Sequence, residues 1–97
     1  MLYSMTDKLN FNEKPQIEIK GKTLTLDNSA PTVLKLMDIV QTKGELEGAK
    51  AVLDLLFDAK DRKTIEGLKL SWDDFTRFCE ICIDLALGND PDKKQGE

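Results

Sequence analysis

Cys79 and Cys82 are the only cysteines of this chain, and they form its only C-x-x-C pair. Two thiols at this spacing could hold a metal ion or exchange with a disulfide. A structural zinc ion, however, needs four ligands, commonly cysteine or histidine, and the chain contains no histidine. A redox dithiol needs its attacking cysteine at a helix N-terminus, where the helix dipole and nearby cations lower the thiol pKa.

The stretch SWDDFTRFCEICIDLALG at residues 71–88 places the pair elsewhere. Ser71 is a favourable N-cap, so the pattern predicts a helix over 72–87. Cys79 then lies about two turns inside this helix, beside Phe78 and Glu80, a setting that raises a thiol pKa. We interpret both cysteines as small buried apolar residues, and no cofactor or metal site is expected.

The predicted helix at 72–87 is unusually apolar around its circumference. At about 100° per residue, its apolar residues cover an arc of roughly 240°, whereas a helix lying on one core needs only a little over 100°. Either the other elements wrap this helix, or part of the arc contacts another chain. The residues at the margins of the arc are the candidate partner-binding residues: Trp72, Ile83 and Leu87 on one side and Ile81 on the other.

A β-hairpin is predicted at about residues 16–27, in the stretch QIEIKGKTLTLD. Apolar and polar residues alternate there, as in a strand with one buried face. A turn at Gly21-Lys22 pairs Ile19 with Leu24 and is the preferred register, because a turn at Lys20-Gly21 sets Ile19 against Lys22. Since a lone hairpin is marginal in water, it is expected to lie on helices or to pair its edge with another strand.

Two further principal helices are predicted, at 30–43 and 45–60, with a short helical turn at 61–66 ended by Gly67. The first begins after Asp27 or Ser29 as cap. Its expected core stripe is Val33, Met37 and Val40, widened by Leu34, Leu36 and Ile39.

The chain is therefore expected to fold as one mainly α (α+β) domain over residues 16–88. Residues 1–15 lack periodicity and are expected to be a flexible N-terminal segment. Residues 89–97, NDPDKKQGE, contain no large apolar residue and are expected to be a disordered polar tail.

The charge pattern disfavours several functions. The formal net charge is -4, and the basic residues are scattered among acidic ones, which argues against nucleic-acid binding. No apolar run is long enough for a membrane span, and two cysteines without a secretion signal indicate reduced thiols in a cytoplasm. Without histidine there is no Ser-His-Asp or Cys-His set, and no Gly-rich phosphate loop is present, so the chain is not expected to be an enzyme.

The hairpin IEIKGKTLTL, two middle helices, the capped helix in GLKLSWDDFTRFCEICIDLALG and the polar tail occur in an order that resembles a known family. It resembles the small tail assembly chaperones of long-tailed, siphovirus-like bacteriophages and prophages, over about residues 16–88. The resemblance implies a non-enzymatic protein of the host bacterial cytoplasm, absent from the finished virion. It also implies binding to the tape measure protein, assistance to polymerisation of the major tail protein, and self-association.

Many of these chaperones are made in two forms, the longer one by a programmed frameshift near the end of the short reading frame. Lys93-Lys94 would suit an A-rich slippery run in the gene. The other interpretation left open is a small cytoplasmic regulatory or adaptor domain that binds a single protein partner.

Overall fold

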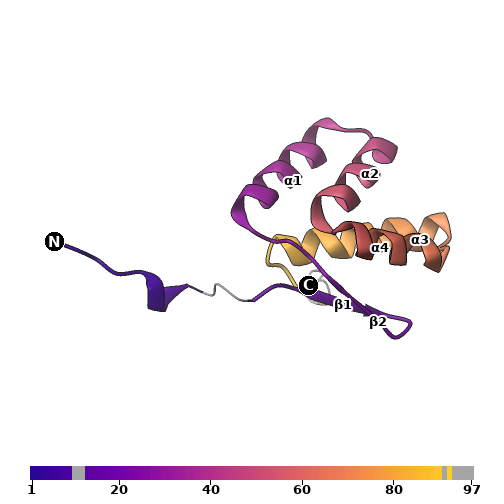
Figure 1. Cartoon of the computed structure of the whole chain (residues 1–97). Helices are drawn as coiled ribbons and strands as arrows, with labels where there is room; N and C mark the ends of the chain where they lie inside the picture. Colours follow the sequence, from indigo (N-terminus) through magenta and orange to yellow (C-terminus); the bar gives the residue numbers. More distant parts are fainter. Residues whose placement is uncertain (10–12, 91, 93–97) are drawn as a thin grey trace.

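The computed structural model of the chain describes residues 1–9, 13–90 and 92 (Figure 1). An antiparallel two-stranded hairpin is followed by four helices, which confirms a mainly α fold with a β-hairpin. The elements are β1 (Gln16–Ile19), β2 (Lys22–Thr25), α1 (Ala30–Thr42), α2 (Glu45–Leu56), α3 (Ala59–Leu68) and α4 (Trp72–Ala86), preceded by a short 3₁₀ turn, η1 (Thr6–Lys8).

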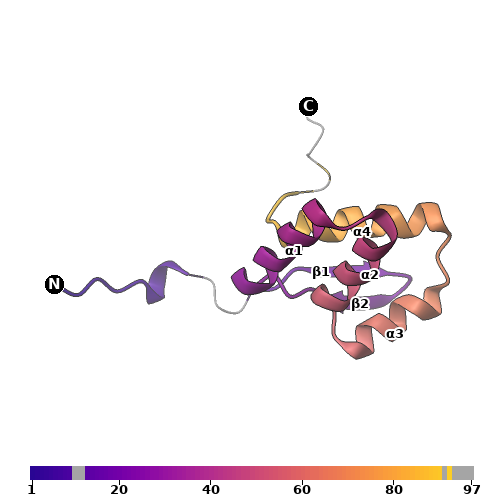
Figure 2. The same ribbon diagram turned by 90° about the horizontal axis from the view of Figure 1, so that it is seen from above.

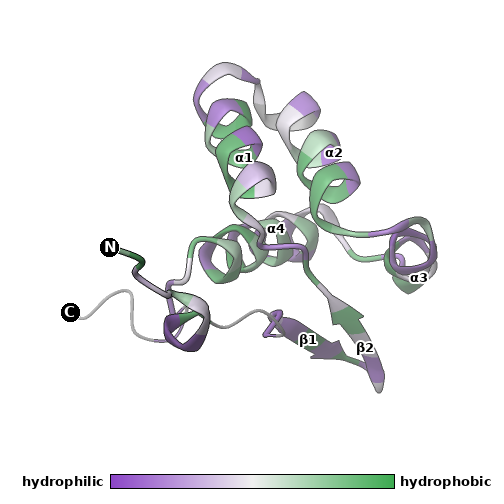
Figure 3. Ribbon diagram, turned by 60° about the vertical axis from the view of Figure 1, so that its left-hand side comes forward, coloured by the Kyte–Doolittle hydropathy of each residue, from purple (hydrophilic) through white to green (hydrophobic). Residues whose placement is uncertain are grey.

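The elements form layers. Figures 1 and 2 show α1 and α2 as a neighbouring pair above α4, with the hairpin on the opposite side of α4 and α3 beside β2. Hydrophobic residues are concentrated along α1, α2 and α4, whereas α3 is mostly hydrophilic (Figure 3). The core lies where these layers meet, and its most completely buried side chains are Leu24, Leu26, Leu36, Leu56 and Cys82.

The hairpin has the register that the sequence analysis disfavoured. Ile19 is paired with Lys22 and Ile17 with Leu24, so the turn is Lys20-Gly21 and the predicted turn at Gly21-Lys22 is wrong. Lys20 has φ 51° and Gly21 has φ 77°, the two positive values that a type I′ turn requires. This turn matches the twist of the strands, and Glu18 Oε2 accepts a hydrogen bond from the Gly21 N–H at 3.0 Å.

The turn supplies a test of the register. Because Asn tolerates positive φ better than Lys, Lys20→Asn is expected to raise the free energy of unfolding by about 0.5 kcal/mol. Urea denaturation of this variant beside Lys22→Asn measures the difference. A gain at position 22 and none at position 20 would restore the register that the structure excludes.

Helix α1 begins and ends close to its predicted limits, but it turns a different face to the core. Leu36 is fully buried and Ile39 packs beside it, whereas Met37 and Val40 of the predicted core stripe are 47% and 55% exposed. Thr32, one turn before Leu36, is buried because its hydroxyl donates to Asp27 Oδ2 at 2.8 Å. The Asp27 carboxylate thereby fixes the rotation of α1.

Helix α2 ends at Leu56, not at residue 60, and the predicted short turn at 61–66 is the longer helix α3. Asp58 separates the two, since its side chain accepts a hydrogen bond from the Asp61 N–H at 2.9 Å and caps α3. Arg62 Nη1 also donates to the Phe57 carbonyl at 2.6 Å, which satisfies an acceptor at the end of α2. These side-chain bonds stabilise a helix boundary inside what the apolar pattern predicts as one helix.

Helix α4 matches its prediction to within one residue. Ser71 Oγ accepts a hydrogen bond from the Asp74 N–H at 3.2 Å, as expected of the N-cap, and Gly88 follows the helix at φ 85°. The residues at the centre of the predicted apolar arc face the core, with Phe78, Cys79, Cys82 and Ala86 buried.

All of residues 1–9 are exposed. Residues 10–12, part of the N-terminal segment predicted to be flexible, lie outside the described residues. The same holds for residues 91 and 93–97, which make up most of the tail predicted to be disordered and include Lys93-Lys94. Within the described ranges, no helix combines the length and the apolar character that a membrane span requires.

Candidate functional site

The two thiols lie in the core. Cys79 is 8% exposed, Cys82 is completely buried, and neither forms a disulfide. Burial raises the pKa of Cys79 to about 11, with a smaller contribution from the Glu80 charge, and burial also raises the pKa of Cys82. Both side chains are therefore protonated and poorly nucleophilic at neutral pH. Over residues 1–9, 13–90 and 92, no three His, Cys, Asp or Glu side chains gather as metal ligands do.

The raised thiol pKa makes stability depend on pH. Above pH 9.0, the ordinary value for this thiol, the unfolded chain loses protons that folded Cys79 keeps until about pH 11. We therefore expect the free energy of unfolding to fall between these values, and urea denaturation across this range measures it. Cys79→Ala is the control, because it removes this contribution and leaves that of Cys82 in place; an unchanged pH slope in this variant would contradict the assignment.

A groove lies between α1, α2 and α4. It is a hollow of about 270 Å³ whose wall is mainly apolar, with Lys43 and Glu80 as its charged residues. Two small residues of α2, Gly48 and Ala49, are among its lining residues. Its uncharged lining residues are Ile39, Val40, Gly44, Gly48, Ala49, Val52, Trp72, Thr76, Cys79 and Ile83.

A second hollow extends the groove along α4. It has a volume of about 130 Å³ and shares the lining residues Val40 and Ile83 with the first, so the two hollows adjoin; together they are called the groove below. Met37 and Leu87 line its far end. From Trp72 to Leu87 the helix rises about 22 Å, the length of about four helical turns.

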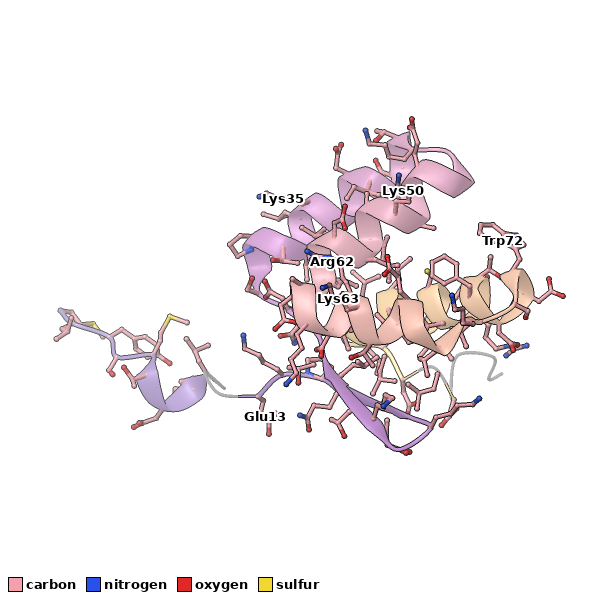
Figure 4. The ribbon with its side chains drawn as sticks, turned by 45° about the vertical axis from the view of Figure 1, so that its right-hand side comes forward. Glu13, Lys35, Lys50, Arg62, Lys63 and Trp72 are labelled. Atoms are coloured by element: carbon pink, nitrogen blue, oxygen red, sulfur yellow. The ribbon has the colours of Figure 1, made fainter. Side chains whose placement is uncertain are left out.

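Large apolar side chains stand exposed along this groove. Trp72 is 51% exposed, Val40 55%, Met37 47% and Leu87 38%. Trp72 projects from the first turn of α4 towards the α1 and α2 pair, and its ring lies 5.8 Å from that of Phe75 (Figure 4). Several exposed large apolar side chains around a concave surface are typical of a protein-binding site.

The structure brings together three of the four predicted partner-binding residues. Trp72, Ile83 and Leu87 lie in the groove, at the same side of α4. Ile81 is half-buried and, at about 100° per residue, lies on the opposite side of α4 from Trp72, outside the residues that line the groove.

The sequence analysis missed the contribution of α1. Met37 and Val40 form one wall of the groove, but their apolar spacing was interpreted as a core-facing stripe. The signal that could have revealed them was the excess of apolar residues on α1, where Leu36 and Ile39 already provide a core face.

No known protein family, curated protein or solved structure shows significant similarity to this chain.

Proposed function

We propose that this chain is a non-enzymatic tail assembly chaperone of a long-tailed bacteriophage or prophage, which binds apolar segments of the tape measure protein in the groove between α1, α2 and α4. The observation that carries the proposal is the mainly apolar groove with four large apolar side chains exposed along it, Met37 and Val40 from α1 and Trp72 and Leu87 from α4. The resemblance of the hairpin and helix order to this family supplies the identity of the partner.

The groove fits an apolar helical segment. Its length of about four turns lets an amphipathic helix lay residues at i, i+3, i+4 and i+7 against it. Fully burying a Val, Leu or Met side chain is worth about 1.5–3 kcal/mol, and the partly exposed side chains of the groove gain a share of this on binding. Lys43 and Glu80 at the groove can orient a segment with charges at its ends.

The rest of the surface suits a solubilising role. The formal net charge of -4 opposes aggregation of complexes with an apolar partner, because like charges on different complexes repel one another. In this proposal the chaperone acts in the host bacterial cytoplasm, self-associates along the tape measure protein, and leaves as the major tail protein polymerises around it.

Co-expression tests the proposal. If the chaperone gene lies between genes for a major tail protein and a tape measure protein, co-expression is expected to keep the tape measure protein in the soluble fraction and to co-purify it. The control is the same tape measure protein expressed alone, which is expected to aggregate. A neighbourhood without tail genes, together with a chain that stays monomeric at high concentration, would instead favour the regulatory or adaptor domain.

A further inference from the structure

The two outer edges of the hairpin differ. On β2, the Thr25 N–H points away from β1 and donates to Asp61 Oδ2 at 3.1 Å. Helix α3 also contacts β2 and lies on that side of the hairpin (Figure 2). The outer edge of β2 is therefore covered by this chain.

The outer edge of β1 pairs with no strand in the described part of the chain. The Leu26 N–H donates to the Pro15 carbonyl at 3.0 Å, and in an antiparallel pair the bonded positions alternate, so Ile17 and Ile19 face β2 in the same way. The main-chain groups of Gln16 and Glu18 consequently point outward, and no residue of the described part of the chain bonds them. Their side chains, like that of Lys14, are exposed.

We propose that the β1 edge pairs with the β1 edge of a second copy of this chain, antiparallel and centred on Gln16, so that two hairpins form one four-stranded sheet. This inference gives a site to the self-association included in the proposed function, but it rests on a different surface from the groove. Strand addition at an open edge supplies main-chain hydrogen bonds to groups that otherwise bond only water.

Charge selects this register. Centred on Gln16, the pairing places Lys14 opposite Glu18 of the second copy, and the two-fold symmetry repeats this opposite-charge pair. A register centred on Ile17 would instead place Lys14 opposite Lys20 of the second copy. Pro15 does not interrupt the pairing, because its nitrogen, which lacks a hydrogen, faces β2.

The residues on the other face of β1 are also compatible with the register centred on Gln16. Pro15 and Ile17 lie on the side of the hairpin that packs towards the core, and both are half-buried. In the register centred on Gln16, Ile17 lies beside Pro15 of the second copy. The combined sheet thus extends one apolar face and one polar face without mixing them.

A charge swap tests the proposal by sedimentation analysis over a range of concentrations. Lys14→Glu alone and Glu18→Lys alone each set like charges opposite one another twice, and each is expected to raise the dimer dissociation constant by about tenfold. Mixing the two variants, or combining both changes in one chain, restores opposite charges and is expected to restore dimerisation. Since Glu18→Lys also removes the bond to the Gly21 N–H, thermal melting of each variant checks that the fold is kept.

A second pair of variants tests the main-chain bonds. Gln16→Pro removes the outward N–H at the centre of the proposed interface and is expected to abolish dimerisation, whereas Gln16→Thr keeps that N–H and is expected to preserve it. Trp72→Ala leaves the β1 edge intact and is expected to leave the dimer unchanged, which separates this inference from the groove. A chain that is monomeric at every concentration, or a dimer insensitive to the charge swap, would overturn the proposal.

Discussion

Trp72→Ala is expected to weaken binding of an apolar tape measure segment by about 30-fold or more. Tryptophan is enriched among the interface residues whose truncation costs at least about 2 kcal/mol, which corresponds to that factor. Because Trp72 is 51% exposed in the free chain, its removal is expected to change the fold and the free energy of unfolding only slightly. Isothermal titration calorimetry with segments of the tape measure protein measures the effect.

Ile81→Ala is the matched control, since Ile81 belongs to the same helix but lies on the side away from the groove. It is expected to leave the dissociation constant within about twofold of the unsubstituted chain. A second groove variant, Val40→Asp, places a charge on the α1 wall and is expected to weaken binding as Trp72→Ala does. If Ile81→Ala weakens binding and both groove variants do not, the binding surface is on the other side of α4.

Leu36→Ala is expected to lower the free energy of unfolding by about 2–5 kcal/mol, a large fraction of the roughly 5–15 kcal/mol of a typical domain. Leu36 is completely buried in the core between α1 and the other elements, so truncation removes apolar contacts and leaves a cavity. Leu34 is the matched control, because it is the same residue type in the same helix but is 68% exposed. Leu34→Ala is expected to change the free energy of unfolding by less than about 0.5 kcal/mol.

Chemical denaturation of both variants decides the rotation of α1. The rotation matters for function, since it places Met37 and Val40 in the groove and not in the core. If Leu36→Ala and Leu34→Ala lower the free energy of unfolding equally, the stripe of Val33, Met37 and Val40 faces the core after all. The proposed binding site then lacks its α1 wall.

Helix α4 was the most predictable part of the chain. Ser71 as cap, an apolar arc wider than one core needs and a glycine after the end are all local signals, and they fixed both its limits and its core face. The same arc gave four candidate partner-binding residues, of which Trp72, Ile83 and Leu87 line the groove and Ile81 does not. What the sequence could not give was the opposite wall, because it depends on how α1 and α2 cross α4.

The other differences have local physical causes that apolar spacing does not reveal. The Asp27 and Thr32 hydrogen bond rotates α1, and Asp58 and Arg62 divide α2 from α3. In the hairpin, the backbone geometry of a type I′ turn outweighs the apolar pairing of Ile19 with Leu24. In each case a few polar or backbone interactions override a weaker hydrophobic preference.

The most direct test of the groove as a binding site measures the fluorescence of Trp72. Trp72 is the only tryptophan of the chain and lies in the groove, so its fluorescence reports on this surface alone. Titration with an apolar tape measure segment that lacks tryptophan is expected to shift the emission to shorter wavelength and to saturate, as the exposed ring becomes buried. Binding of the segment, detected by calorimetry, without any change in Trp72 emission would contradict the groove as the binding site.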